Sequence, residues 1–471
     1  MATKVLVPGK FVVLHAGHIR LFRFAKDLGD QIVAALDISG LTKDQVTWRI
    51  DVLSNLEFVN SVETFDGDIT NLLNKVKPEL VLKGREFADL FNIETDVLHT
   101  YGGRLVFSSG TTYYSEDDLV GTLTENPTLN ISGQEFLDRN SIKLKDILGI
   151  LDRIEGIRTC VIGDVIVDEV VNCHPVGMSR EDPSIVVTPV EAARFVGGAG
   201  IVAGHCNALG SRTTLVTVLG NDEPAAWCKP ELKDIISEVI VFSDNDRKTT
   251  LKQRFKSGKQ ILLKLNHFSQ EPIQTQTENN IFEYFVENIR NFDLLIFSDF
   301  SYGTLSANLS NKLINLAREF NVLIVADSQT SSQSGNLSKF SGATMITPTE
   351  IEARNEIRDD LSGLVVIAQQ VRKLLEARYV LLKLGADGVL LHGLDSNGKV
   401  LSTDLVPSLN KNPIDTSGAG DSMLAGSAVS LACGESLYIS AFIGSLMSAI
   451  QVSRIGNTPI TRKDIESVLL S

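Results

Sequence analysis

Residues 415–421, Asp-Thr-Ser-Gly-Ala-Gly-Asp, constrain the fold of this chain more than any other segment, because an apolar run with helical spacing (422–432) follows at once. Small residues let a backbone close around an anion, and a helix starting there directs its N–H groups and positive dipole end at the same point. An isolated Gly-x-Gly is more often a plain turn before a core helix, but here two aspartates bracket the glycines. A carboxylate at such a site can take the proton of an alcohol that attacks a phosphoryl group. The segment therefore predicts phosphoryl transfer from a nucleotide to a hydroxyl.

The same segment resembles the signature of the ribokinase-like, or PfkB, sugar kinases. The resemblance implies that Asp421 is the catalytic base. It also implies an anion hole for the nucleotide phosphate, formed by the backbone of Ser417, Gly418, Ala419 and Gly420.

Bulk properties narrow the class of protein. At 471 residues the chain is too long for one hydrophobic core, so we expect at least two domains. A formal net charge of −14 argues against a nucleic-acid partner, which needs a basic face. No apolar run is long enough to cross a membrane and the start lacks the long apolar stretch of a signal peptide, so we expect a cytoplasmic protein without a membrane partner. The five cysteines are scattered without a CxxC pair, which favours buried free thiols over disulfides or zinc.

Short apolar strands alternate with helical patterns in both halves, which predicts an α/β fold with parallel sheets. Expected strands are residues 4–7, 31–36, 62–65, 80–82 and 105–107, then 159–162, 294–297, 322–326 and 380–384. The polar, turn-prone region between the halves suits a linker. We therefore expect a Rossmann-like domain at 1–125, a linker at 126–141 and a larger domain at 142–471.

A histidine pair follows the first expected strand. His15 and His18 flank Gly17, at a point where imidazoles near a helix N-terminus can donate to phosphate and to departing pyrophosphate. The alternatives are plain loop histidines or a metal pair, and the absence of nearby acidic or cysteine ligands disfavours the metal.

The flanking residues resemble the HxGH motif of the cytidylyltransferase-like nucleotidyltransferases over roughly residues 4–120. The resemblance implies catalysis by His15 and His18, Mg²⁺, and nucleotide contacts from Gly9, Lys10, Lys83, Ser109 and Thr111. Lys10 and Val12 replace the threonine and aspartate of the common motif, although a lysine can still bind a phosphate as a point charge.

The PfkB resemblance extends over roughly residues 142–471 and predicts a ribokinase-like domain with a small β lid. It implies substrate binding by Asp168, Gly197, Gly198 and Asp299, Mg²⁺ organisation by Glu352, and a turn near the nucleotide base at Gly385 and Gly388. Residues 185–194 would form the lid, which pairs subunits in many relatives, so we expect a homodimer.

Among PfkB kinases the pattern is similar to the heptose-phosphate kinases of ADP-heptose synthesis, notably at residues 179–187 and 247–254. In that family a kinase and an adenylyltransferase share a chain, with the kinase first; here the order is reversed. Several positions differ: Ile201 and Ser445 replace asparagines, Tyr302 replaces a lysine, Gln329 replaces the lysine of a Pro-Lys pair, and Lys383 replaces a common threonine.

Together these features predict a bifunctional sugar-nucleotide enzyme. The kinase would phosphorylate a sugar phosphate, heptose 7-phosphate by resemblance, with Mg²⁺ and ATP. The first domain would join a nucleotide to the sugar 1-phosphate, giving ADP-heptose and pyrophosphate. The alternatives are a cytidylyltransferase that uses CTP on another polyol or sugar phosphate, and a sugar-phosphate-binding protein with a degenerate kinase site.

Overall fold

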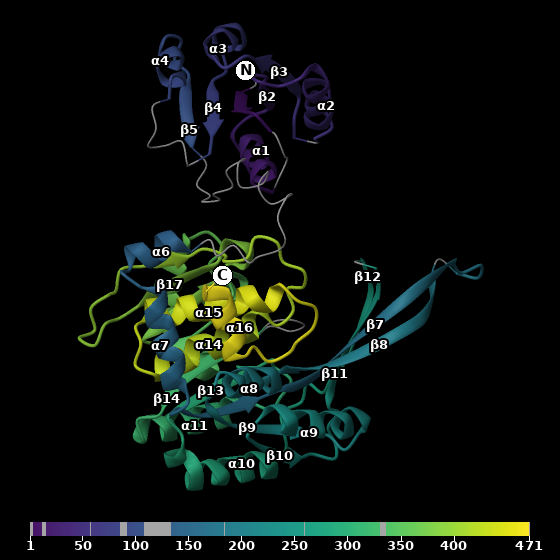
Figure 1. The fold of residues 1–471 in the computed structure, drawn as a ribbon, viewed down its shortest axis with the longest axis vertical. Coiled ribbons are helices and arrows are strands. Elements are labelled where there is room, and N and C mark those ends of the chain that lie inside the picture. The colour runs from purple at the N-terminus through teal and green to yellow at the C-terminus, as the bar shows by residue number, and fades with distance from the viewer. Residues whose placement is uncertain are drawn as a thin grey trace. The chain divides into compact units, whose positions relative to one another are not determined.

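A computed structural model describes residues 3–11, 16–56, 58–84, 92–107, 133–182, 184–258, 260–329 and 336–470. The chain forms two compact units, Met1–Thr128 and Leu129–Ser471, which we call the N-terminal unit and the C-terminal unit (Figure 1). Both combine helices with mainly parallel sheets, so the predicted α/β fold class is confirmed.

The N-terminal unit is built on a parallel five-stranded sheet of order β3-β2-β1-β4-β5. Its strands are β1 (Lys4–Gly9), β2 (Gln31–Asp37), β3 (Ser61–Phe65), β4 (Leu80–Lys83) and β5 (Arg104–Phe107). The chain order reverses between β1 and β4, and in such sheets ligands bind at the carboxyl ends of the strands at this switch point.

Helices cover both faces of this sheet. α1 (Ala16–Leu28) and α2 (Lys43–Ser54) share one core with β1, β2 and β4, while α3 (Thr70–Val76) and α4 (Glu94–His99) share the other core with the opposite face of the same strands. α2 begins where it does because Thr42 and Gln45 form a capping box.

The C-terminal unit is built on a nine-stranded sheet of order β10-β9-β6-β13-β14-β15-β16-β17-β18. The strands are β6 (Arg158–Gly163), β9 (Arg212–Leu219), β10 (Glu238–Ser243), β13 (Leu294–Asp299), β14 (Leu323–Ser328), β15 (Met345–Ile346), β16 (Tyr379–Lys383), β17 (Val389–Gly393) and β18 (Asp404–Val406). All pairs are parallel except β16–β17 and β17–β18. The central strand β13 is buried throughout, as expected for a parallel strand covered on both faces.

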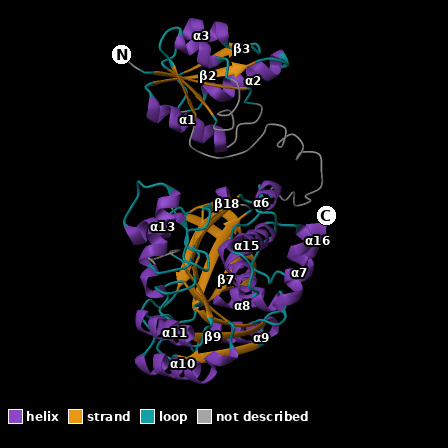
Figure 2. Cartoon of the chain, turned by 90° about the vertical axis from the view of Figure 1, so that its left-hand side faces the viewer, coloured by secondary structure: helices purple, strands orange, loops and turns teal. Residues whose placement is uncertain are grey.

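Two helical layers enclose this sheet (Figure 2). One layer contains α7 (Leu144–Ile154), α8 (Ala199–Ala208), α9 (Glu223–Ile235), α14 (Ala419–Ala432), α15 (Leu437–Val452) and α16 (Arg462–Leu470). The other contains α10 (Thr275–Asn288), α11 (Ala307–Glu319), α12 (Glu350–Ile357) and α13 (Leu364–Leu374), with the short 3-10 helices η2 (Ile289–Asn291) and η3 (Leu337–Phe340).

Helix α6 (Gln134–Arg139) lies within the range where the sequence suggests a linker, yet it packs on the C-terminal unit. Phe136 and Leu137 are buried in that unit's core, and the Phe136 ring stacks on Phe442 at 6.2 Å. Arg139 forms an ion pair with Asp404 of β18 at 2.7 Å. α6 is therefore part of the C-terminal unit.

A separate four-stranded sheet of order β12-β11-β7-β8 projects from this unit (Figure 1). Its strands are β7 (Val165–Met178), β8 (Ile185–Gly198), β11 (Thr250–Ser257) and β12 (Gln260–His267). This is the predicted β lid, and it carries β7 directly out of the end of β6.

The cysteines are all free, and four of the five are buried. Within the ranges described, no helix has the length and apolarity needed to cross a membrane.

Candidate functional site

The carboxyl ends of β13, β14 and β16 meet the first turn of α14, and this edge gathers most of the predicted kinase residues. Asp299 ends β13, Ser328 ends β14 and Lys383 ends β16. Because parallel strands end at one edge, their terminal side chains and the following loops converge there. Asp421 lies in the first turn of α14.

The loop before α14 is fixed by contacts from side chains to its backbone. Gly418, the N-cap residue, has a φ of +75°, and a Cβ on it would lie 2.0 Å from Asn457 Oδ1, so only glycine fits. Asp415 Oδ1 accepts from the Ser417 N–H at 2.9 Å. From α15, the buried Gln451 side chain donates to the Ser417 carbonyl at 3.2 Å. These contacts fix the backbone at the N-terminus of α14, which is where the sequence predicts an anion hole.

Asp421 is 6% exposed and lies among other charged groups. Burial raises its pKa to about 7, with a further increase from Asp327 and a partial offset from Lys383. Gln329 Nε2 donates to Asp421 Oδ1 at 2.9 Å. A carboxyl group with a pKa near neutrality is suited to proton transfer.

Lys383 forms a buried ion pair in the same site. Its Nζ lies 2.7 Å from Asp327 Oδ1, which also accepts from Thr347 Oγ1 at 2.8 Å. Burial alone lowers the pKa of a lysine, but Asp327 and Glu352 outweigh it and raise the pKa of Lys383 above its usual value. The ammonium is therefore charged at neutral pH.

Glu352, the predicted Mg²⁺ residue, lies in the first turn of α12. Its carboxylate accepts from the Thr349 N–H at 2.7 Å, completing a capping box with the Thr349 hydroxyl. The side chain is buried, and its charge acts on both Asp327 and Lys383. Over the described ranges, no group of three or more His, Cys, Asp or Glu side chains is arranged to hold a metal ion.

Asp168 lies where the lid joins the main sheet. Its Oδ1 is 3.2 Å from Arg254 Nη2 of the neighbouring strand β11, but it accepts no hydrogen bond from any described residue. Burial raises the pKa of Asp168, and Arg254 and Lys252 offset part of the increase. A Cβ on Gly197 would lie 2.4 Å from Asp168 Oδ2, so this glycine gives the carboxylate its space. The role of Asp168 as a substrate ligand stays a prediction.

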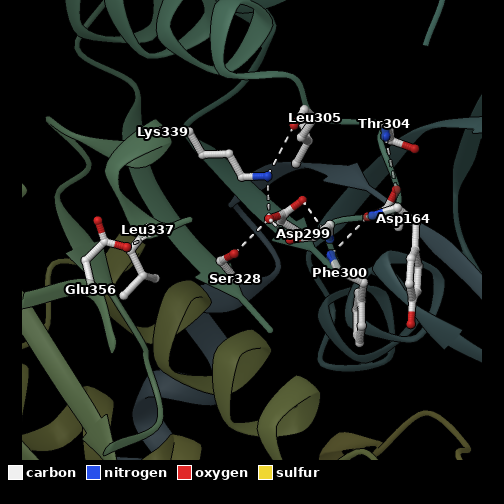
Figure 3. A network of polar contacts seen from close by, with 11 residues as sticks. Asp164, Asp299, Phe300, Thr304, Leu305, Ser328, Leu337, Lys339 and Glu356 are labelled. Carbon is white, nitrogen blue, oxygen red and sulfur yellow. Dashed lines mark hydrogen bonds and ion pairs between the residues drawn. The ribbon is translucent and has the colours of Figure 1, made fainter. Parts of the chain in front are cut away.

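Asp299 is held inside the protein. It is 1% exposed, forms an ion pair with Lys339 Nζ at 2.6 Å, and accepts from Ser328 Oγ at 2.8 Å (Figure 3). Burial raises the pKa of Asp299, while Lys339 opposes the increase. Its role as a substrate ligand stays a prediction, and the geometry shows a carboxylate whose contacts are internal.

Asp164 organises the loop after β13. Its carboxylate accepts from the N–H groups of Phe300, Tyr302 and Thr304 at 2.9, 3.2 and 3.2 Å (Figure 3). The aromatic rings of Phe300 and Tyr302 in this loop are stacked, with their centroids 6.3 Å apart. Lys252 Nζ of β11 lies 5.1 and 5.2 Å from the two ring centroids.

Gly385 and Gly388 form the turn between β16 and β17. The 3-10 helix η4 (Gly385–Asp387) occupies it, and Gly388 has a φ of +99°. The turn follows Lys383 directly, so it lies at the same edge of the sheet as the loop before α14.

In the N-terminal unit, Gly9 ends β1 and Lys83 ends β4, on the two sides of the switch point. Lys10 is exposed, and the His18 ring packs edge-on against the buried Phe11 ring at 5.1 Å. Lys83 Nζ lies 2.9 Å from Glu94 Oε1 and 2.8 Å from Asn92 Oδ1. His15, Ser109 and Thr111 lie outside the described residues.

Sequence reasoning did not assign Asp327 or Gln329 to the kinase site, and it did not identify Lys339 as the partner of the buried Asp299. Asp327 and Gln329 could have been found, because they lie at the end of the strand next to β13. Nothing in the sequence marks Lys339, which reaches Asp299 only through the packing of η3.

Comparisons with known proteins agree with the fold of the C-terminal unit. The family model described as pfkB family carbohydrate kinase matches residues 158–463. The Bifunctional protein HldE of Pelobacter propionicus is 25% identical over 335 residues, covering 70% of this chain and 65% of that protein. The protein of the same name from Sulfurimonas denitrificans is 28% identical over 319 residues, covering 66% of this chain and 63% of that protein. This chain therefore spans somewhat less than two thirds of the length of these relatives.

A solved structure shows the same fold. Arabidopsis thaliana ribokinase, complexed with ribose and ATP, superposes with a TM-score of 0.52 at 18% identity, covering 66% of this chain and 98% of the ribokinase. The predicted ribokinase-like fold of the C-terminal unit is confirmed, and so is the resemblance to bifunctional proteins of the HldE kind.

Proposed function

We propose that this chain catalyses two reactions, phosphorylation of a sugar phosphate and transfer of a nucleotide to the sugar 1-phosphate. The chain belongs to the pfkB family of carbohydrate kinases. Membership makes it an enzyme that transfers phosphorus-containing groups. The observation that carries the kinase proposal is Asp421, buried beside the N-terminus of α14 with a pKa of about 7.

In the proposed kinase reaction, Asp421 takes the proton of an acceptor hydroxyl. The acceptor oxygen bonds to the γ-phosphorus of ATP as the bond to the β–γ bridging oxygen breaks, and ADP leaves. The N–H groups of Gly418, Ala419 and Gly420 would hold the phosphate, with Ser417 completing the loop. In this role α14 stabilises the negative charge without any movement of the backbone.

The residues present fit Mg²⁺ bound chiefly through the nucleotide. Kinase Mg²⁺ ions are usually held by one or two carboxylates, waters and substrate phosphates rather than by a closed protein cage. Glu352 is the carboxylate we assign, because it is buried at the edge where the phosphates would lie. The ion would neutralise phosphate charge there.

The acceptor site would lie between the lid and the carboxyl edge of the sheet. Asp168 Oδ1, which accepts no hydrogen bond from a described residue, would accept from a sugar hydroxyl. Gly197 and Gly198 let the sugar approach the backbone. We propose heptose 7-phosphate as the acceptor, on the resemblance at residues 179–187 and 247–254, a segment whose Arg254 and Lys252 partly offset the raised pKa of Asp168.

The N-terminal unit would join a nucleotide to the sugar 1-phosphate and release pyrophosphate. The supporting features are the switch point between Gly9 and Lys83 and the position of His18 in the first turn of α1. We propose ATP as the nucleotide and ADP-heptose as the product, with CTP as the alternative.

We also propose that the lid pairs two copies of the chain. Eight of its large apolar side chains are 40–73% exposed, namely Val176, Met178, Ile185, Val186, Val190, Ile261, Leu263 and Leu265. Pairing would remove this apolar surface from water, and sedimentation of the purified chain tests it.

The decisive experiment measures ADP and pyrophosphate separately, with heptose 7-phosphate in a panel of sugar phosphates and with ATP or CTP. Asp421→Asn should stop ADP formation and leave pyrophosphate release intact when sugar 1-phosphate is supplied. His18→Ala should do the reverse. Pyrophosphate release with CTP but not with ATP would select the cytidylyltransferase alternative. An absence of ADP formation with every acceptor would contradict the kinase proposal.

A further inference from the structure

One cation of the kinase site has no role in the mechanism above. Lys383 ends β16 with its side chain 11% exposed, and its Nζ lies 2.7 Å from Asp327 Oδ1. A buried ammonium is costly unless it is paired, and one aspartate satisfies only part of its three-donor capacity.

The ammonium lies beside the proposed anion hole. A Cβ built on Gly420 would be 3.6 Å from Lys383 Nζ and 3.7 Å from Gln329 Nε2. Gln329 Nε2 in turn contacts both Asp421 Oδ1, at 2.9 Å, and Asp327 Oδ2, at 3.3 Å. Two side-chain nitrogens therefore converge on the first turn of α14, next to the proposed base.

Both positions also depart from the pattern of the kinases that the sequence resembles. Gln329 is neutral where the heptose-phosphate kinases have a lysine, and Lys383 is charged where a threonine is common. The chain has thus lost a cation after β14 and gained one at the end of β16, and both side chains bind Asp327.

We propose that Lys383 binds the terminal phosphate of ATP and neutralises its charge during transfer. This inference rests on the proposed kinase function. Asp421 must touch the attacking hydroxyl, so the γ-phosphoryl group lies next to Asp421 and within reach of Lys383. Asp327 holds the ammonium in place, and the remaining N–H groups of Lys383 donate to phosphate oxygens. Lys383 is then a catalytic residue, and Asp327 is its positioning residue.

The test uses the full-length chain and needs no acceptor sugar. The photoreactive analogue 8-azido-ATP labels the protein, and peptides from residues 129–471 are quantified so that the N-terminal unit does not contribute. Unlabelled ATP and ADP then compete, and the ratio of their apparent affinities reports contacts to the terminal phosphate.

In Lys383→Met, the apparent affinity for ATP should fall by about tenfold or more, because a charge-assisted hydrogen bond to the γ-phosphate is lost. The apparent affinity for ADP should not change. Lys383→Thr, which carries the residue common in relatives, should show a loss in the same direction and serves if Lys383→Met does not fold. An ATP-to-ADP ratio within about twofold of the wild type in a folded variant would overturn the proposal.

Lys339→Met is the matched control. Lys339 is also a buried lysine paired with an aspartate, at 2.6 Å from Asp299. Its replacement removes the same charge from the same unit but should leave the ATP-to-ADP ratio unchanged. An equal loss in both variants would indicate a general effect of unpairing a buried aspartate and would contradict the assignment to Lys383.

The outcomes separate this inference from the proposed function. If the ratio depends on Lys383 but no acceptor is phosphorylated, phosphate binding by Lys383 stands and the acceptor assignment fails. If ADP forms in an Asp421-dependent reaction and the ratio ignores Lys383, the kinase stands and this inference fails.

Discussion

The segment 415–421, which comprises the loop before α14 and the first turn of that helix, carries an aspartate at each end, and the two differ in electrostatic state. Asp415, at the start, accepts hydrogen bonds from the N–H groups of Ser417 and Gly456, which outweigh burial and lower its pKa. Asp421, at the end, is buried near Asp327 and Asp168, and its pKa is raised to about 7. The sequence motif presents them symmetrically, but the fold makes one a structural anchor and the other a candidate base.

The difference shows how a fold assigns chemistry to identical side chains. N–H donors stabilise a carboxylate, so Asp415 stays ionised and holds the loop. Burial among acids destabilises a carboxylate, and Gln329 and Lys383 only partly compensate at Asp421. The fold thus disfavours the ionised form of Asp421, which we call the strained carboxylate, and favours the ionised form of Asp415, which we call the relaxed carboxylate.

The largest expected effect is on kcat for ADP formation and comes from removing the carboxylate of Asp421. Asp421→Asn should lower kcat for ADP formation by about 10³-fold, because the neutral amide cannot accept the hydroxyl proton. Pyrophosphate release by the N-terminal unit should not change. Asp415→Asn is the matched control, and it should cost less than about tenfold because it alters only loop support. Equal losses of kcat in the two variants would contradict the assignment of Asp421 as the base and of Asp415 as loop support.

The same substitution should stabilise the protein. Asp421 has a folded pKa near 7 against an ordinary value of 3.8, so its ionisation costs nothing below about pH 4 and the full amount above pH 7. Asp421→Asn removes this cost, which is at most about 4 kcal/mol above pH 7. Urea unfolding at pH 8 and pH 4.5, followed through Trp227 in a Trp48→Phe background, measures it. A gain of equal size at both pH values would show that ionisation is not the cause.

The pH dependence of catalysis should follow the ionisation of Asp421. Below pH 7, kcat should fall about tenfold per unit, since only the carboxylate acts as a base. The groups that set this pKa are Asp327, Asp168, Lys383 and Gln329. Gln329→Leu should move the midpoint to higher pH, because it removes a hydrogen bond to the carboxylate. A midpoint near pH 4 in the wild type would refute the assignment of Asp421 as a strained base.

Much of this architecture could be predicted from the sequence. Strands with continuous apolar runs, such as β13 and β14, and the motif before α14 depend on local patterns, so their positions were predictable. The lid was predicted only through resemblance, because β12 is mostly exposed and β11 is mostly half-buried, so neither has the alternating buried face that marks a strand in a sequence.

The site was less predictable than the fold, because its charges are paired across distant segments. Asp299 looked like a substrate ligand, yet Lys339 reaches it from η3, 40 residues later in the chain. Lys383 and Asp327 are 56 residues apart and meet only because β16 and β14 end at one edge. No local pattern records such contacts, and the direction of each pKa shift depends on them.

The smallest expected effect is on the free energy of unfolding and concerns Asp415, the carboxylate with the lowered pKa. Asp415→Asn should lower the free energy of unfolding by about 1 kcal/mol at pH 7, because an amide oxygen accepts the Ser417 and Gly456 N–H groups more weakly than a carboxylate. The lowered pKa of Asp415 sets the sign: its contribution is present above an ordinary aspartate pKa and is lost as the pH falls through the lower folded value. The difference between Asp415→Asn and the wild type should therefore shrink towards pH 3, whereas that of Asp421→Asn grows towards pH 8. Urea unfolding of both variants across this range measures the two trends together. Parallel trends would contradict the division of this loop into an anchor and a base, because two carboxylates in the same environment must respond to pH in the same direction.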